Sequence, residues 1–204
     1  MRLTRLQKAL WLAVAVAALG VAGLTIAARD GSPDAARSSA SAETLRADFE
    51  LTDHRGMVQS DEDFRGRWML VFFGFANCPD VCPMGLATMA DVVDALGPRA
   101  ADVQPLFVTV DPERDTPAAL AEYVPRFHPA ILGLGGTPEQ IARTAETFAV
   151  YHERIEDPAA PDGYTMGHTS SILLFDPEGA FVRTYEHDRK AEEIAADLGA
   201  RIDA

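Results

Sequence analysis

Cys78 and Cys82 are the only two cysteines of the chain, and they lie in the segment Gly74-Phe-Ala-Asn-Cys-Pro-Asp-Val-Cys-Pro83, directly after an apolar run at 68–73. Two thiols in one turn can bind a soft metal or exchange disulfides with a partner. A purely structural disulfide is disfavoured, because a bridge over three intervening residues closes a short loop and stabilises little. The pair therefore predicts the working site and leaves its chemistry open.

The predicted position of the pair, at the start of a helix, bears on that chemistry. Residues four apart face the same side of a helix, so both sulfurs can point at one spot. Exposed backbone N–H groups and the helix dipole favour anions there, and we expect at least one thiol to have a lowered pKa. Two thiolates suit Cu(I) or Zn(II), and either ion would seek a further protein ligand.

His168 is the candidate for that ligand. It leads directly into a predicted strand at 171–175, which can carry its ring over the cysteine turn; the other histidines are at positions 54, 128, 152 and 187. Two Cys and one His would give a three-coordinate site for Cu(I), or with a further ligand a site for Cu(II). Among the methionines, Met84 and Met89 have the spacing of helix core, whereas Met166 is a candidate extra contact two residues before His168.

Apolar runs and helix-start signals predict the elements that position these residues. We expect a short hairpin from 49–58 and 64–68, strands at 68–73, 103–110, 131–134, 171–175 and 181–185, and helices at 83–96, 116–127, 137–148 and 189–202. This order predicts an α/β sandwich with a mixed central sheet flanked by helices, the thioredoxin-like arrangement. Its active cysteines would lie where a central strand ends and a helix begins.

The N-terminal part predicts export. Arg2, Arg5 and Lys8 precede an uncharged stretch at 9–28, which as a helix would span about 30 Å. We expect residues 1–28 to form a retained transmembrane helix rather than a removed signal peptide, with the basic end cytoplasmic. Residues 29–44 have the composition of a flexible linker, which leaves 45–204 as the folded domain. The expected location is a bacterial-type inner membrane, single-pass, with the domain on the periplasmic side.

The overall charge excludes one class of partner. The formal net charge is −13, and an acidic surface repels the phosphates of nucleic acids. We expect a solvated acidic face that keeps the exported domain soluble.

Three motifs together are similar to the Sco/SenC family of membrane-anchored copper-binding proteins. They are Cys78-Pro-Asp-Val-Cys82-Pro83, Val110-Asp-Pro-Glu-Arg-Asp-Thr-Pro117 and the strand entry at His168. The resemblance covers roughly 49–202 and implies a thioredoxin fold that binds one copper ion through Cys78, Cys82 and His168. It also implies assembly of the binuclear CuA centre of cytochrome c oxidase, by copper delivery or by reduction of the oxidase cysteines. The implied partners are the copper-site subunit of the oxidase and, as further candidates, other copper chaperones or thiol reductants.

The chain departs from the family pattern at two positions. Gly167 stands where members usually have an Asp before the His, and Asn77 stands where an aromatic residue or His commonly precedes the first Cys. Neither position is a ligand, but the missing Asp removes a charge that could tune copper affinity or docking. The acidic stretch 111–117 is expected to be a salt-bridged loop in which Asp115 or Thr116 caps the next helix, so it stays outside the site.

The favoured function is a copper metallochaperone, a binding and transfer protein rather than an enzyme. The alternative is an exported thiol-disulfide oxidoreductase that uses Cys78 and Cys82 alone. Such enzymes usually separate their cysteines by two residues and place a cis-Pro opposite them, whereas this chain has three residues between the cysteines and Gly167-His168-Thr169 at the strand entry. A peroxiredoxin-type peroxidase needs a Pro and a Thr or Ser shortly before its Cys, and 74–77 supply neither.

Overall fold

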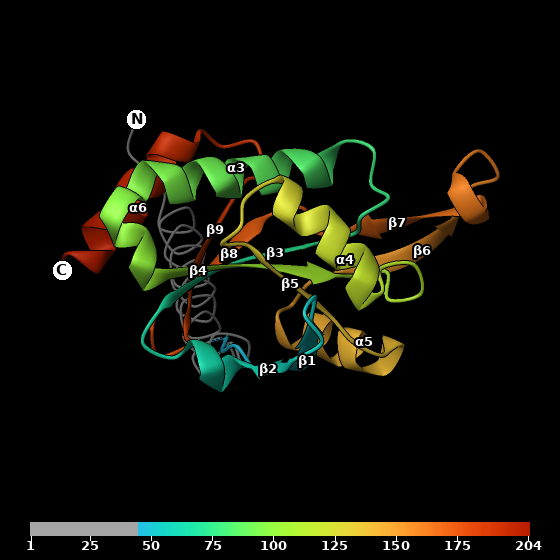
Figure 1. Ribbon diagram of the computed structural model, residues 1–204, viewed down its shortest axis with the longest axis horizontal. Coiled ribbons are helices and arrows are strands. Elements are labelled where there is room, and N and C mark those ends of the chain that lie inside the picture. Colours follow the sequence, from blue (N-terminus) through green and yellow to red (C-terminus); the bar gives the residue numbers. More distant parts are fainter. Residues whose placement is uncertain (1–44) are drawn as a thin grey trace, which may run out of the picture. The chain divides into compact units, whose positions relative to one another are not determined.

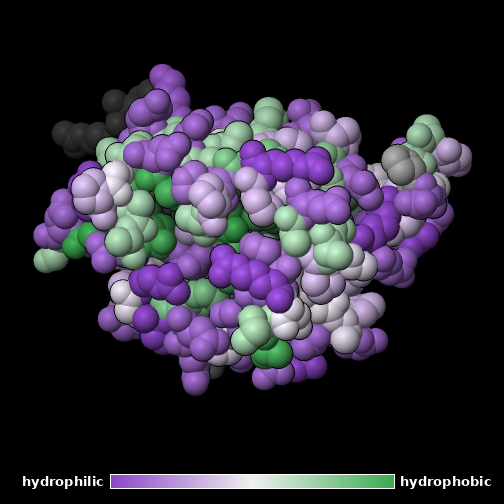
Figure 2. Space-filling model, viewed as in Figure 1, coloured by the Kyte–Doolittle hydropathy of each residue, from purple (hydrophilic) through white to green (hydrophobic). Residues whose placement is uncertain are grey.

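The computed structural model describes residues 45–204, so the expected membrane helix at 1–28 and linker at 29–44 lie outside the described residues. Within the described part, no helix is long and apolar enough to cross a bilayer. Figure 2 shows hydrophilic side chains over most of the visible face, with apolar ones scattered between them.

A seven-stranded mixed sheet in the order β2-β1-β5-β4-β3-β8-β9 forms the centre of this domain. Its strands are β1 (Glu50–Asp53), β2 (Val58–Ser60), β3 (Trp68–Gly74), β4 (Val103–Thr109), β5 (Leu132–Gly135), β8 (Ile172–Phe175) and β9 (Phe181–Tyr185). β3 runs parallel to β4 and antiparallel to β8, in the middle of the sheet. A strand flanked on both sides and covered on both faces needs apolar residues at every position, which the run from Trp68 onward supplies.

Helices cover both faces of the sheet (Figure 1). They are α3 (Val81–Leu96), α4 (Pro117–Tyr123), α5 (Pro138–Thr147) and α6 (Ala191–Ile202), with 3₁₀ turns η1 (Asp61–Phe64), η2 (Gly97–Asp102) and η3 (Val124–Arg126). Successive strand residues point to opposite faces. Accordingly, the ring of Phe72 packs against Gly85 of α3, whereas the ring of Phe73 meets Phe148, at the end of α5, with 5.4 Å between centroids.

Most predicted elements are confirmed, with two corrections. β1 and β2 form the expected hairpin around Gly56, but the stretch predicted to continue it from Phe64 is the end of η1 followed by a turn at Gly66, which has a positive φ. The predicted helix 116–127 is α-helical only to Tyr123 and continues as η3. Pro125 accounts for the change, because it has no N–H to donate to the carbonyl one turn earlier.

A two-stranded ribbon outside the main sheet was not predicted. β6 (His152–Glu156) and β7 (Tyr164–His168) pair antiparallel, joined through the turn η4 (Pro161–Gly163). Figure 1 shows the ribbon extending beyond the end of the central strands. β6 is mostly exposed, so it lacks the apolar alternation from which strands are predicted. The ribbon matters because β7 ends at His168.

Candidate metal centre

The dithiol turn connects the end of β3 to the start of α3. Cys82 lies in the first turn of α3 and is 0% exposed, whereas Cys78 is only partly buried. Both cysteines are free thiols, and the backbone N–H of Cys82 donates to Sγ of Cys78 at 3.4 Å. Gly74 makes room for this arrangement, because a Cβ there would lie 2.9 Å from Sγ of Cys82. The turn therefore holds one sulfur in the core and presents the other at the surface.

The two sulfurs have opposite acidities. The hydrogen bond from the Cys82 side chain, aided by one from His168, lowers the pKa of Cys78 to about 4. The same hydrogen bond, together with burial, raises the pKa of Cys82 above its usual range. The expectation that one thiol is acidic is met by Cys78. The cause is chiefly a neighbouring thiol that stabilises the thiolate, rather than the helix dipole alone.

His168 reaches the sulfurs from the end of β7. Its Nε2 lies 3.3 Å from Sγ of Cys82, and its Nδ1 lies 2.9 Å from the carbonyl oxygen of Thr169. A carbonyl only accepts hydrogen bonds, so Nδ1 carries a proton and Nε2 faces the sulfurs. Nε2 offers its lone pair to a metal when the ring is neutral, and its N–H can bond the Cys78 thiolate when the ring is protonated. The rings of Phe72 and Phe75 hold the imidazole edge-on at centroid distances of 6.1 and 5.8 Å.

The structure brings all three predicted ligands into one group. Their ligand atoms lie within 4.8 Å of one another. With metal–sulfur bonds of about 2.3 Å, ligand atoms around one ion stand about 4 Å apart, so only a small contraction would close the group on an ion. Two sulfur ligands and one imidazole suit soft ions such as Cu(I).

One of the two methionines predicted to lie in the helix core is exposed. Met89 is buried in the core, as expected for its helical spacing, but Met84 is 42% exposed. Three residues from the start of α3, Met84 falls on the solvent side of the helix, so its assignment to the core was wrong. Met166 packs against the core from β7.

The loop after β4 supports the dithiol turn. Asp115 is buried, and its carboxylate accepts hydrogen bonds from the backbone N–H of Ala76 at 2.9 Å and from the hydroxyl of Thr109 at 2.6 Å. Burial raises the pKa of Asp115. Thr116 caps α4 by accepting from the N–H of Ala119. The expected salt-bridged, helix-capping loop is therefore present, and it also fixes the backbone two residues before Cys78.

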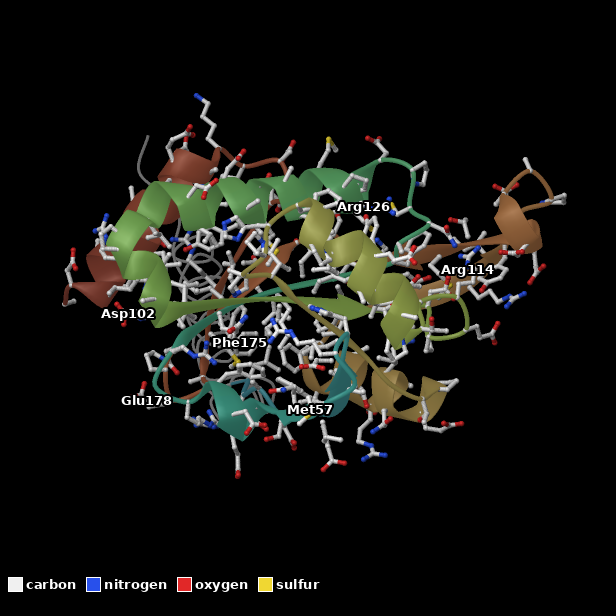
Figure 3. The ribbon with its side chains drawn as sticks, in the orientation of Figure 1. Met57, Asp102, Arg114, Arg126, Phe175 and Glu178 are labelled. Atoms are coloured by element: carbon white, nitrogen blue, oxygen red, sulfur yellow. The ribbon has the colours of Figure 1, made fainter. Side chains whose placement is uncertain are left out.

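The same loop anchors the ribbon. Arg114 forms an ion pair with Asp111, and its guanidinium lies 3.8 Å from the ring centroid of Tyr164 in β7. The hydroxyl of Tyr164 donates to Asp111 at 2.9 Å, and Arg154 of β6 stacks against the Tyr164 ring at 3.6 Å. Arg114 thus lies at the junction of loop and ribbon (Figure 3). Sequence reasoning missed Tyr164, because a single aromatic residue in a polar stretch gives no periodic signal.

Gly167, the departure before His168, lies under an apolar side chain. A Cβ at Gly167 would come 3.1 Å from Cδ1 of Ile155 on β6, and Ile155 is itself 45% exposed. The end of the Ile155 side chain therefore occupies the space beside position 167 that a larger side chain would enter.

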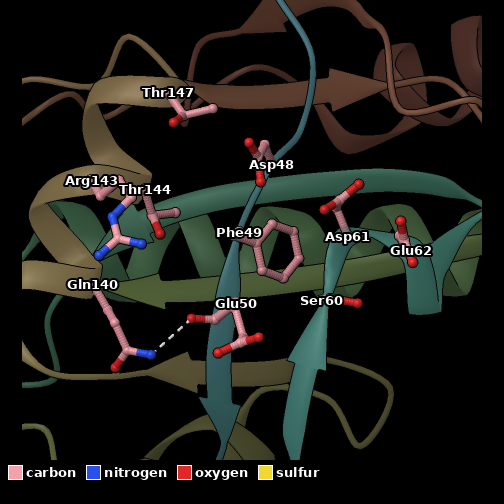
Figure 4. A pocket seen from close by; sticks show the side chains of 10 residues that line it. All are labelled: Asp48, Phe49, Glu50, Ser60, Asp61, Glu62, Gln140, Arg143, Thr144 and Thr147. Atoms are coloured by element: carbon pink, nitrogen blue, oxygen red, sulfur yellow. Dashed lines mark hydrogen bonds between the residues drawn. The ribbon is translucent and has the colours of Figure 1, made fainter.

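The domain also has a cleft that lies apart from the three clustered side chains. This cleft of about 560 Å³ is lined by residues from β1, η1 and α5, among them Glu50, Asp61 and Arg143 (Figure 4). None of the three clustered ligands lines it, so the cleft is no part of the candidate metal centre.

These features define a class of protein: a thioredoxin-like domain with two thiols and an imidazole grouped for one soft metal ion. The chain belongs to the SCO1/SenC family, whose model matches residues 37–203. It is 42% identical over 191 residues to the mitochondrial SCO2 homolog of Bos taurus, which covers 90% of this chain and 71% of that protein. The chain spans only 63% and 57% of the corresponding mouse and human proteins.

Solved structures of Sco proteins are similar to this chain. Bradyrhizobium japonicum ScoI with copper bound is 40% identical and superposes with a TM-score of 0.71, over 76% of this chain and 98% of that one. BsSco, described as having a disulfide switch and as a member of the Sco family of cytochrome c oxidase assembly proteins, is 25% identical with a TM-score of 0.62, over 78% of this chain and 96% of that one.

Proposed function

We propose that this protein is a copper metallochaperone that binds one copper ion through Cys78, Cys82 and His168. The observation that carries the proposal is the convergence of the three side chains at the end of the central strand, with ligand atoms within 4.8 Å. The copper-bound state of the related ScoI structure supports copper as the ion. Cys78 supplies a thiolate at neutral pH, Cys82 becomes a thiolate as the metal displaces its proton, and His168 supplies Nε2.

The recipient in this proposal is the CuA-site subunit of cytochrome c oxidase. Support comes from BsSco, which belongs to a family of oxidase assembly proteins. Residues 1–28 would hold the protein in the inner membrane as a single transmembrane helix, and 29–44 would tether the domain 45–204 on the periplasmic side. In that compartment the domain could reach a membrane-bound oxidase. Other copper chaperones or thiol reductants are candidate donors.

A second function, thiol-disulfide exchange, is favoured by one specific observation. The pKa of Cys78 is lowered to about 4, so Cys78 is a thiolate over the whole physiological pH range, and it is the accessible member of the pair. The disulfide switch described for BsSco is consistent with this activity. Reduction of oxidase cysteines and delivery of copper can then use the same two sulfurs.

The test is His168→Ala in the full chain purified in detergent. We expect Cu(I) affinity, measured by competition with a chromophoric chelator, to fall at least a hundredfold, since a ligand of a three-coordinate site is lost. The dithiol should still form a disulfide and be reduced again. His128→Ala is the matched control, because His128 pairs with Asp94 outside the site. Unchanged copper stoichiometry and affinity in His168→Ala would refute the metal site.

A further inference from the structure

The ribbon carries a second histidine beside His168. The N–H of Thr169 donates to the carbonyl oxygen of Tyr151 at 3.0 Å, which makes these two residues a hydrogen-bonded pair in the same register as β6 and β7. Hydrogen-bonded and non-hydrogen-bonded pairs alternate along antiparallel strands. His152 and His168, the next pair, are therefore the non-hydrogen-bonded kind, with Cα atoms about 4.5 Å apart and side chains at their closest.

A methionine shares that face of the ribbon. Residues directly opposite each other project to the same side of a sheet, and so do residues two apart on one strand. His152, His168 and Met166 are thus neighbours on one face. His152 and Met166 are diagonal partners, and long side chains at such positions reach each other.

The surroundings of His152 and Met166 suit a ligand. Both line a cavity of about 230 Å³ whose wall includes apolar Val110, Pro112 and Ile141. Within residues 45–204, the imidazole of His152 has no hydrogen bond or ion pair. A histidine without a polar protein partner at the edge of a partly apolar cavity, with a thioether beside it, offers one nitrogen and one sulfur donor.

Charge in this cavity does not oppose a cation. Arg154 lines it, but its guanidinium pairs with Glu113 at 3.0 Å and with Glu156 at 3.1 Å. Glu153 also lines the cavity. The nearby positive charge is therefore balanced by acidic groups.

We propose that His152 and Met166 form a second, weaker Cu(I) site, from which the ion passes to His168 and the two sulfurs. Thioether and imidazole donors favour Cu(I) over harder ions. His152 stands directly opposite His168 across the ribbon, so the path from this site to the group of three ligands is short. The transfer of the ion from this second site to the first rests on the proposed copper function. Binding of Cu(I) by His152 and Met166 can be tested independently of that function.

The test uses the full chain carrying Cys78→Ser and Cys82→Ser, which removes the dithiol. Cu(I) is added anaerobically as its acetonitrile complex, and the methionine methyl groups are observed by NMR. We expect the methyl signal of Met166, assigned through its loss in Met166→Leu, to shift on Cu(I) addition. Adding Met166→Leu or His152→Phe to this protein should weaken Cu(I) binding at least tenfold. Met57→Leu is the control, because Met57 is 61% exposed in the turn between β1 and β2.

Two results would overturn the second site: no shift of the Met166 signal, or equal Cu(I) binding with and without Met166→Leu, a substitution that keeps an apolar side chain of similar size. Failure of the proposed function looks different, because the protein with both cysteines would then lack tight one-to-one Cu(I) binding. With both cysteines present, Met166→Leu should slow Cu(I) loading severalfold in stopped-flow measurements, and an unchanged rate would refute the loading route.

Discussion

The two halves of the candidate metal centre are built in different ways. The dithiol turn extends from the central strand, with Cys82 in the core and Gly74 giving it room. The half with His168 belongs to a ribbon outside the main sheet, which is held by the stacking of Arg114 and Arg154 on Tyr164 and by the ion pair with Asp111. The sulfurs are thus fixed by packing within the core, whereas the imidazole also depends on the buried polar and aromatic contacts that anchor the ribbon beside the core.

This difference predicts that folding stability and copper affinity respond differently to substitutions in the two halves. Substitutions in the dithiol turn should change both folding stability and sulfur chemistry, because buried packing determines both. Substitutions in the ribbon should change copper affinity more than stability, since β6 is largely exposed and the contacts that anchor the ribbon lie outside the central core.

The largest expected effect concerns the origin of the acidity of Cys78. The hydrogen bond from Cys82 is the chief cause of its lowered pKa, and the bond from His168 is weaker. Removing a donor to a thiolate destabilises the charged form. Cys82→Ala should therefore raise the pKa of Cys78 by several units, toward the usual value of about 8.5, and His168→Ala should raise it less. Ultraviolet thiolate absorbance against pH measures both, and equal rises would show that His168 of the ribbon contributes as much to the acidity as Cys82 and contradict the assignment of Cys82 as its chief cause.

A smaller effect is expected from added volume in the dithiol turn. In Gly74→Ala the new methyl group would lie 2.9 Å from both Sγ of Cys82 and the ring of Phe107. Overpacking of this kind costs about 1–3 kcal/mol, and Cu(I) affinity should fall because Cys82 is displaced. The matched variant in the ribbon is Gly167→Ala, where only the flexible end of Ile155 is close. In denaturant unfolding, Gly74→Ala should lower the free energy of unfolding clearly more than Gly167→Ala does. The reverse order would contradict the proposed difference between the dithiol turn and the ribbon.

The smallest effect is expected at the anchor of the ribbon. Tyr164→Phe removes the hydroxyl that donates to Asp111 but keeps the ring between the two guanidinium groups. The loss of one hydrogen bond costs about 1 kcal/mol, and we expect Cu(I) affinity to fall while the pKa of Cys78 rises less than in His168→Ala. Tyr151→Phe is the control, because the Tyr151 hydroxyl contacts only the exposed Glu153. Equal copper affinity in Tyr164→Phe and the original protein would mean that the anchor does not position His168.

The central half of this structure follows from sequence patterns. The apolar run before the cysteines is buried from Met69 to Phe73, and the capping box from Thr137 to Gln140 begins α5. Such features are local, since strand burial and helix caps depend on neighbouring residues in the chain. The grouping of Cys78 with Cys82 follows equally from their spacing.

The ribbon could not be predicted in this way. Its first strand, from His152 to Glu156, is polar and mostly exposed, and its anchor requires Arg114 and Tyr164 to meet across 50 positions of sequence. Neither feature leaves a periodic pattern. The strand entry and the resemblance both indicated His168 as a ligand, but its ring is carried by the end of β7 and not by the strand predicted at 171–175. The residues that position it became evident only from the structure.

The unequal depths of the two sulfurs have a consequence for transfer. Because Cys82 is 0% exposed whereas Cys78 and His168 are partly exposed, a ligand from a partner protein can approach a bound ion from the side of Cys78 and His168 but not from that of Cys82. The ligands of the ion would therefore be exchanged in a fixed order. The thiolate of Cys78 would be replaced first, and that of Cys82 would dissociate last. In that order the ion stays coordinated by this protein until a ligand of the partner has bound it.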